Sequence, residues 1–417
     1  MNRIRPLEDK HAAAMARLML LAYPGYNLAP DARQSTEGWV REVVKRGERD
    51  RLEGYFEPDG TLSGGVRILS QPMNLRMHQV KAIGLGALCV DLLHKKKKIA
   101  LELLCNAFKA GRESGACMAV LDPFHIGFYK KMGCGIAMKH HQFRLTPYQM
   151  PSNGDRSRVV ELTKSDFPEI ISYHNEYAAL HHGMLMRAEH EVREVLEECQ
   201  MILGVREKSQ LMGIMAIRFQ RTAPENLFKT NLLVEELVYD HPGVLQAFTA
   251  FLHAQADQVN QIILTSQDSC FEVLLDNPDT GSDDTFHTRK NEMYRTGNGM
   301  MVRILDLSKV MNTIQAPETM KEFFPIQMRL EDSLMTDLSG NWLLGAENGR
   351  ITVKRQAEQQ EVDLALTVSD LASLVMGSVD FNSLIRYGRV TVIKPEIIKC
   401  LAEIFHYPEA PVCLSRF

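Results

Sequence analysis

The sequence predicts a mixed α/β protein of three domains, in which the second domain is a degenerate copy of the first. Its 417 residues give two to three domains at roughly 150 residues per domain. Apolar residues make up 45% of the chain and charged residues 24%, as in an ordinary globular protein. Helical and strand patterns alternate, and their order in the first third returns in the second. These observations exclude a disordered chain or a fibrous repeat and indicate tandem mixed-sheet domains.

The first domain is expected to start with helices and to continue as a run of strands. Apolar residues at helical spacing indicate the helices, and alternating apolar residues indicate the strands. Pro58-Asp59-Gly60 lies between two alternating segments and therefore predicts the turn of a β-hairpin. The predicted elements are helices over about 8–22 and 37–46, strands over 51–57, 61–76 and 80–90, a helix over 99–114 and a strand over 117–121.

A linker over Thr146–Arg158, rich in Pro, Ser, Asn and Gly, is expected to end the first domain. The pattern of Leu62–Ile68 returns in Leu211–Ile217, and a strand ending at Leu237–Tyr239 again precedes a helix, as in the first domain. A later strand, helices and a final helix over 395–405 indicate a third, α+β region. The predicted domains are residues 1–150, 151–307 and 308–417.

Charge and composition narrow the class of protein. The net charge of -4 lacks the basic excess of a nucleic-acid-binding protein. Arg17 interrupts the first apolar stretch, which indicates an amphipathic helix rather than a signal peptide or a membrane span. The eight cysteines include no CxxC pair, and the adjacent pairs His140-His141 and His181-His182 lack a third ligand, so reduced thiols and no metal are expected. A cytoplasmic protein is the expectation.

The sharpest chemical signal is a run of four lysines between a strand and a helix. The strand ends in Leu88-Cys89-Val90, and Lys95–Lys98 precede the helix that starts at Ile99. A helix N-terminus offers unpaired N–H groups and partial positive charge, to which the lysines add full charges, so the loop is suited to a pyrophosphate. The alternative is a solvated basic start of a helix.

Two motifs in the first domain resemble the GNAT acetyltransferase superfamily. Lys95-Lys96-Lys97-Lys98-Ile99-Ala100 resembles its acetyl-CoA loop, Arg/Gln-x-x-Gly-x-Gly/Ala, with Lys98 in the place of the glycine. Phe128-Tyr129 followed by Gly133 resembles the helix that comes after the splayed strand of that fold. Ile385–Val390 resembles a sterol-carrier-protein type domain. The whole chain thus resembles the enhanced-intracellular-survival (Eis-like) N-acetyltransferases: two tandem GNAT-like mixed-sheet domains, then a sterol-carrier-protein-like α+β domain.

This resemblance implies acetyl transfer from acetyl-CoA to a small-molecule or peptide amine by direct attack in a ternary complex, without a metal. Tyr129 is the implied general acid, because a phenol with a pKa of about 10 keeps its proton at neutral pH. The terminal carboxylate of Phe417 is the implied base. Relatives form closed oligomers, so a homo-oligomer is expected. The implied cofactor-binding residues are Leu88, Cys89, Val90, Lys95, Lys96, Lys97, Lys98, Ile99 and Ala100.

Other interpretations stay open at this point. Tyr129 could be a packed aromatic, and Phe417 a frayed end. The chain could be a lipid or sterol carrier that acts through its third domain, or a non-catalytic CoA-binding regulatory protein. The second copy enters its helix through Asp240-His241-Pro242-Gly243, with an acid where phosphate would lie, and is not expected to bind CoA.

Overall fold

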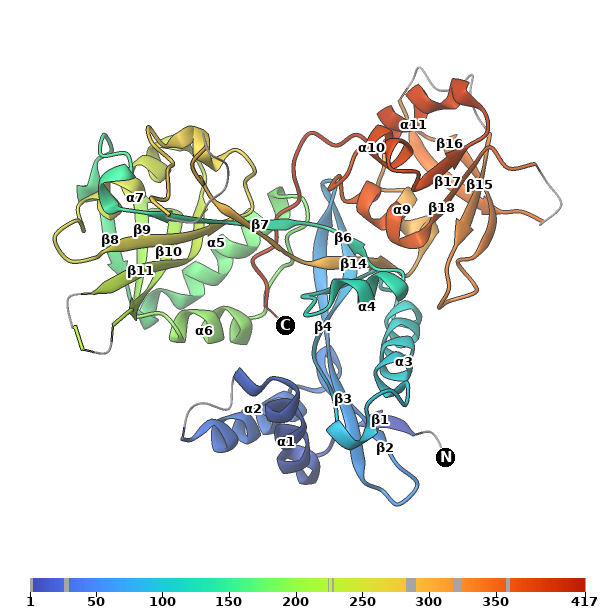
Figure 1. Ribbon diagram of the computed structural model, residues 1–417, viewed down its shortest axis with the longest axis horizontal. Helices are drawn as coiled ribbons and strands as arrows, with labels where there is room; N and C mark the ends of the chain where they lie inside the picture. The colour runs from blue at the N-terminus through green and yellow to red at the C-terminus, as the bar shows by residue number, and fades with distance from the viewer. Residues whose placement is uncertain are drawn as a thin grey trace. The chain divides into compact units, whose positions relative to one another are not determined.

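The computed structural model describes residues 3–25, 30–223, 225–226, 229–282, 290–317, 325–357 and 361–416. The chain divides into two compact units (Figure 1). The first comprises Met1–Ala137 and Met300–Glu409, and the second comprises Met138–Gly299 and Ala410–Arg416. Three sheets build these units, two in the first and one in the second.

The first sheet of unit 1 has seven strands in the order β1-β2-β3-β4-β5-β14-β6. Its β4 and β5 pair in parallel, and all its other neighbours are antiparallel. The predicted hairpin is confirmed, with Gly60 in the left-handed conformation that its turn requires. The strands are β1 (Ile4–Pro6), β2 (Asp50–Phe56), β3 (Leu62–Leu75), β4 (His78–Val90), β5 (Met118–Leu121), β6 (Gly135–Ile136) and β14 (Met301–Ile304).

Helices cover both faces of this sheet because its strands alternate apolar side chains between two cores. On one face α3 (Ile99–Glu113) and α4 (Ile126–Lys131) pack in a cluster with Val66, Ile68 and Phe108. On the other face α1 (Ala12–Ala22) and α2 (Ala32–Arg46) pack against strand residues such as Leu52 and Leu62. Short 3-10 helices lie at Asp9–His11, Gly47–Arg49 and Leu92–His94. The second helix starts at Ala32, earlier than its apolar spacing predicts.

The C-terminal part of unit 1 is the expected α+β region, a five-stranded sheet in the order β17-β16-β15-β18-β19. Its strands are β15 (Ile326–Glu331), β16 (Gly340–Glu347), β17 (Arg350–Arg355), β18 (Leu364–Thr367) and β19 (Val390–Val392). Its helices are α8 (Leu307–Met311), α9 (Val368–Val375), α10 (Phe381–Arg386) and α11 (Ile398–Phe405), with a 3-10 turn at Pro395–Ile397 before α11.

Two buried arginines tie this region to the first sheet. Arg303 of β14 pairs with Asp332 and donates to the carbonyl of Met132. Arg76, in the turn between β3 and β4, donates to backbone carbonyls at the ends of α9 and α11, among them those of Val375 and Phe405 at 2.9 Å. Burial lowers the pKa of Arg76 to about 10, and the guanidinium still stays charged at neutral pH. Each arginine satisfies carbonyls or a carboxylate that burial would otherwise leave unpaired.

Unit 2 repeats the topology of the first sheet, in the order β13-β7-β12-β11-β10-β9-β8. Among the described strands of this sheet, β11 and β12 form the one parallel pair, as β4 and β5 do in the first sheet. The strands are β7 (Lys139–Leu145), β8 (Val159–Leu162), β9 (Met201–Glu207), β10 (Gln210–Arg221), β11 (Thr230–Tyr239), β12 (Gln261–Ser266) and β13 (Arg295–Asn298). The helices are α5 (Phe167–Leu180), α6 (Glu189–Glu197) and α7 (Pro242–His253), with 3-10 turns at Pro147–Gln149, Arg156–Arg158, Lys164–Asp166 and Phe271–Leu274.

Each of the two like sheets contains one strand that directly follows, in sequence, a strand of the other sheet. The strand β7 follows β6 in sequence, yet it inserts between β12 and β13 of unit 2. In the same way β14 follows β13, yet it inserts between β5 and β6 of unit 1. The linker expected at Thr146–Arg158 therefore lies after a strand of the second sheet. The domain ranges 1–150, 151–307 and 308–417 stay a proposal.

No helix in the described ranges is both long enough and apolar enough to span a membrane. All eight cysteines are free thiols, and five of them are buried.

Candidate functional site

The parallel strands β4 and β5 separate at a bulge in β4. Their pairing covers Ala82–Leu85 of β4 and Met118–Leu121, where β5 ends. Beyond it, the β3 register moves from Arg67 opposite Gly86 to Gly65 opposite Cys89, which leaves an extra residue in β4. Ala87 in this bulge has a φ of 48°, a left-handed conformation that is uncommon for alanine. Within the described residues, Gly86–Val90 therefore pair with β3 alone.

The end of β4 presents backbone groups on the side away from β3. The N–H of Asp91 donates to the carbonyl of Ser63 at 2.9 Å, so Asp91 faces β3. Backbone groups alternate in direction along a strand, and Val90 and Leu88 therefore face the opposite side. The Leu88 carbonyl accepts a hydrogen bond from the Tyr23 hydroxyl at 2.9 Å, in agreement with that direction. The N–H groups of Leu88 and Val90 are thus suited to bind a carbonyl oxygen.

Asp91 holds the start of the basic loop. Its carboxylate accepts from the N–H of Leu93 at 2.9 Å and from Arg17 at 3.0 Å. The Leu93 hydrogen bond, followed by Arg17, lowers the pKa of this carboxyl below its ordinary value. The loop is therefore fixed at one end by a carboxylate that stays ionised.

The four lysines lie exposed between this anchor and α3. Lys96 and Lys98 have φ values of 65° and 64°, in the left-handed region that favours glycine. Lys98 is the N-cap of α3, and the first-turn N–H groups that follow it, including those of Ile99 and Ala100, have no partner within the helix. The chain thus keeps the backbone conformation of a glycine at a position where it has lysine.

Tyr129 of α4 lies in the same core cluster as Leu88, Val90 and Ile99. Its side chain is buried, with edge contacts to Phe128 and Phe124 at ring-centre distances of 5.1 and 5.9 Å. Burial raises the pKa of the Tyr129 phenol well above its ordinary value, and the neighbouring Tyr23 raises it further. The phenol therefore keeps its proton at neutral pH, as a proton donor must.

Cys89 faces away from the predicted cofactor groups. Its side chain belongs to the opposite core, beside Met15. Burial raises the pKa of the Cys89 thiol to about 12. A thiol that stays protonated is a poor nucleophile, so Cys89 contributes packing rather than chemistry.

Sequence reasoning did not single out Tyr23 and Phe124, which lie beside Tyr129. Phe124 is 68% exposed, which is unusual for so large an apolar side chain. Its position in the segment Asp122-Pro123-Phe124, directly after β5, is the sequence feature that could have indicated a place near the site. Tyr23 has no such signal, because its contact with Leu88 spans 65 positions of sequence.

The chain before Phe417 is fixed residue by residue on unit 2, whereas Phe417 itself lies outside the described residues. The Gln267 side-chain amide donates to the carbonyl of Cys413 at 2.7 Å and accepts from its N–H at 2.6 Å. Buried Arg187, which pairs with Glu236, donates to the carbonyl of Leu414. Arg416 forms ion pairs with Glu198 and Glu235 at 3.0 and 2.9 Å.

The second copy has no comparable phosphate site at the start of its helix. His241 caps α7 and accepts from the N–H of Gly243, and its other ring nitrogen lies 3.1 Å from Glu207. Asp240 accepts from the Tyr173 hydroxyl. This end is therefore capped by a side chain and flanked by carboxylates. Among the described residues, no group of three or more His, Cys, Asp or Glu side chains is arranged to hold a metal.

Comparison with known proteins gives a domain family for the N-terminal region and another for the C-terminal region. Residues 3–137 match the acetyltransferase (GNAT) domain family, and residues 313–414 match the sterol carrier protein domain family. No curated protein sequence matches the chain.

Several solved structures share the fold over the whole length. A GCN5-related N-acetyltransferase from Anabaena variabilis is 16% identical with a TM-score of 0.81, covering 99% of each chain. One from Kribbella flavida is 18% identical with a TM-score of 0.76, covering 100% of both chains. Eis1 from Mycobacterium abscessus is 19% identical with a TM-score of 0.75, again covering 100% of both chains.

The chain is an acyltransferase, with an N-terminal GNAT acetyltransferase domain and a C-terminal sterol carrier protein domain. Its architecture is the Eis-like one, two tandem GNAT-like mixed sheets followed by the sterol carrier protein region. The predicted family resemblance and fold class are confirmed.

Proposed function

We propose that the protein transfers an acetyl group from acetyl-CoA to a small-molecule or peptide amine by direct attack within a ternary complex. The observation that carries this proposal is a convergence in unit 1. The bulged end of β4, the basic loop before α3 and the buried phenol of Tyr129 belong to adjoining segments around one core cluster. The corresponding end of the second copy is capped and acidic, which supports one cofactor site per chain.

In this proposal the loop and the helix start bind the pyrophosphate of acetyl-CoA. Lys95–Lys98 supply charge, and Ile99 and Ala100 supply first-turn N–H groups. The acetyl carbonyl accepts hydrogen bonds from the strand end at Leu88 and Val90, which also stabilises the oxyanion of the tetrahedral intermediate. Cys89, which lies between them in the set that the resemblance implies, stays part of this proposal through its backbone, while its side chain packs against Met15.

Acetyl transfer then needs one proton donor and one proton acceptor. The amine attacks the thioester carbonyl, and the C–S bond breaks as the tetrahedral intermediate collapses. Tyr129 donates its proton to the departing thiolate. The terminal carboxylate of Phe417 takes the proton from the amine, a role proposed from the resemblance alone. No cysteine nucleophile is required, in keeping with the protonated Cys89 thiol.

The remaining expectations form part of the same proposal. A cytoplasmic location is supported by eight free thiols. A homo-oligomer is proposed from the resemblance alone. A non-catalytic CoA-binding protein would share the loop but show no turnover, so an acetyl-transfer assay separates the two functions.

Charge reversal in the loop tests the cofactor site. Titration calorimetry with CoA should give one site per chain, and Lys95→Glu/Lys96→Glu should weaken it more than tenfold because phosphate contacts are electrostatic. Added salt should also weaken binding. Lys109→Glu, at an exposed position further along α3, should bind CoA as the wild type does. Unchanged affinity in the double variant would remove the loop from the proposal.

Lys98→Gly separates backbone strain from charge at the loop. Removing a left-handed lysine should raise the free energy of unfolding by about 1 kcal/mol, measured by denaturant titration. CoA affinity should fall by a few-fold, because the ammonium group is lost. Lys97→Gly is the matched control: Lys97 is not among the residues with positive φ, so its replacement should not stabilise the fold. Tighter CoA binding by Lys98→Gly would count against a native CoA function.

A further inference from the structure

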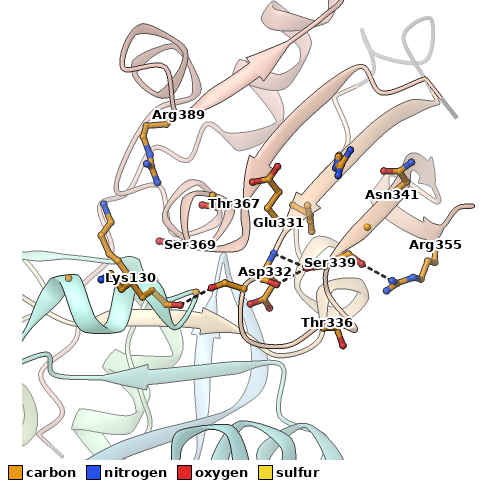
Figure 2. A pocket seen from close by; sticks show the side chains of 17 residues that line it. Lys130, Glu331, Asp332, Thr336, Ser339, Asn341, Arg355, Thr367, Ser369 and Arg389 are labelled. Carbon is orange, nitrogen blue, oxygen red and sulfur yellow. Dashed lines mark hydrogen bonds between the residues drawn. The ribbon is translucent and has the colours of Figure 1, made fainter. Parts of the chain in front are cut away.

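Unit 1 contains a second charged site, outside the acetyl-CoA loop. It is a hollow of about 1030 Å³ between α4 and the sheet of the sterol carrier protein region (Figure 2). One wall comes from the end of α4 and the turn at Gly133. The others come from β15 with the turn after it, from the ends of β16 and β17, and from the segments around Thr367 and Arg389.

Most of the charged side chains that line this hollow are basic. Five basic side chains are present, against two carboxylates, those of Glu331 and Asp332. The charge of Asp332 is already balanced by Arg303, since both side chains are fully buried and form an ion pair. The hollow therefore keeps an excess of positive charge. The basic residues are Lys130, Lys131, Arg329, Arg355 and Arg389.

Most of these cations lack a carboxylate partner. In the part of the chain that the structure describes, the side chains of Lys130, Lys131 and Arg329 form no ion pair or hydrogen bond, although the backbone carbonyl of Lys131 accepts from the Ser333 hydroxyl at 3.0 Å. Arg355 donates to backbone carbonyls, including that of Ser339 at 2.6 Å. Arg389 is the exception, with hydrogen bonds of 3.2 and 2.8 Å to Asp370.

The polar lining also indicates what kind of ligand fits. In Figure 2 the Lys130 side chain extends from α4 toward Arg389. The Thr336 hydroxyl is a further donor in the lining. Leu330 is the one apolar side chain among the described residues that line the hollow, whereas a sterol or an acyl chain needs apolar walls. Converging lysines and arginines without counter-charges attract anions, and arginine matches the geometry of phosphate oxygens.

We propose that this hollow binds a small anion that carries at least two phosphate groups. The excess positive charge exceeds what one phosphate would balance, and the volume is more than a pyrophosphate needs, so larger polyphosphates and nucleoside diphosphates or triphosphates fit the same chemistry. The site is separate from the loop Lys95–Lys98, which precedes α3. It shares α4 with Tyr129, whose ring points into the core while Lys130 and Lys131 line the hollow.

Titration calorimetry of the full chain with pyrophosphate tests this site. Because pyrophosphate would also bind the acetyl-CoA loop, the background is the Lys95→Glu/Lys96→Glu variant. One pyrophosphate per chain should still bind there, with an affinity that decreases as salt is added. Adding Lys130→Gln/Arg329→Gln, or Lys131→Gln as a single change, should weaken it, by tenfold or more for the double change. Lys354→Gln, at an exposed position of β17 outside the hollow, is the matched control and should bind as before.

Three results would overturn the proposal. If pyrophosphate binding disappears in the Lys95→Glu/Lys96→Glu variant, the anion binds at the acetyl-CoA loop and not in the hollow. Binding that survives Lys130→Gln/Arg329→Gln unchanged, or orthophosphate that binds as tightly as pyrophosphate, would show that the hollow has no polyphosphate site. The Lys130→Gln/Arg329→Gln changes in a chain with the wild-type loop should leave CoA binding and acetyl transfer unchanged, so these two measurements report separately on the proposed function. Thermal melting confirms that each variant is folded.

Discussion

Tyr129→Phe should lower kcat by roughly 10² or more and leave CoA affinity nearly unchanged. The variant keeps the ring in its core cluster and its contacts with Phe124 and Phe128, and it removes only the proton donor. Because burial raises the pKa of the phenol, the wild type should show no loss of rate from ionisation of Tyr129 below about pH 10. Steady-state kinetics over a pH series, with CoA titration beside it, measures both effects.

Tyr23→Phe is the matched control for this experiment. Its hydroxyl lies at the same site, but its proton is already donated to the Leu88 carbonyl. Its removal should loosen the strand end and lower the rate far less than Tyr129→Phe does. If Tyr23→Phe abolished turnover while Tyr129→Phe stayed active, the assignment of the acid would be wrong. A lowered melting temperature in Tyr129→Phe would instead indicate a packing role.

Residues added after Phe417, or deletion of Phe417, should reduce turnover by about 10² or more while CoA still binds. The chain up to Arg416 is held by Gln267, Arg187 and two ion pairs, so these changes should displace the carboxylate without releasing the segment before it. Acetyl-transfer rates and CoA titration on the same samples separate the two outcomes.

The control for the C-terminal changes is an extension of equal length before Met1. Such an extension should leave the acetyl-transfer rate unchanged. A protein with a C-terminal tag and full activity would show that the carboxylate of Phe417 takes no part in proton transfer. The base would then have to be sought among groups of unit 1.

Local patterns were enough to predict most elements of the fold. These patterns depend on residues close together in sequence. They include the turn at Pro58–Gly60, the helix from Ile99 and the similar order of elements in the two copies. Pairing between distant strands leaves no such local signal. The segments that form β7 and β14 both look like ordinary strands, and nothing within either one specifies which sheet it joins. Arg303 likewise gave no sign that its charge would be balanced by Asp332, 29 positions later.

The candidate site likewise has some features with a local sequence signal and others that depend on tertiary packing. The lysine loop and Tyr129 stand in local motifs and were predictable. The bulge at Ala87 was not, since alanine does not favour a positive φ and only the surrounding sheet imposes it. The hydrogen bond from Tyr23 to Leu88 also depends on tertiary packing. Sequence therefore indicated the chemistry of the loop, while the direction of the backbone groups at the end of β4 required the folded chain.

The placement of β7 and β14 also affects how the chain folds as the ribosome makes it. The first sheet lacks the strand between β5 and β6 until Met301–Ile304 have been synthesised. At the usual speed of translation, about 165 residues of intervening chain take on the order of 10–30 s. During that time the edge of β5 is unpaired and open to wrong partners. The first sheet is thus completed only after Met138–Gly299, the main segment of unit 2, has been translated, and a fragment ending near residue 137 would lack part of its own sheet.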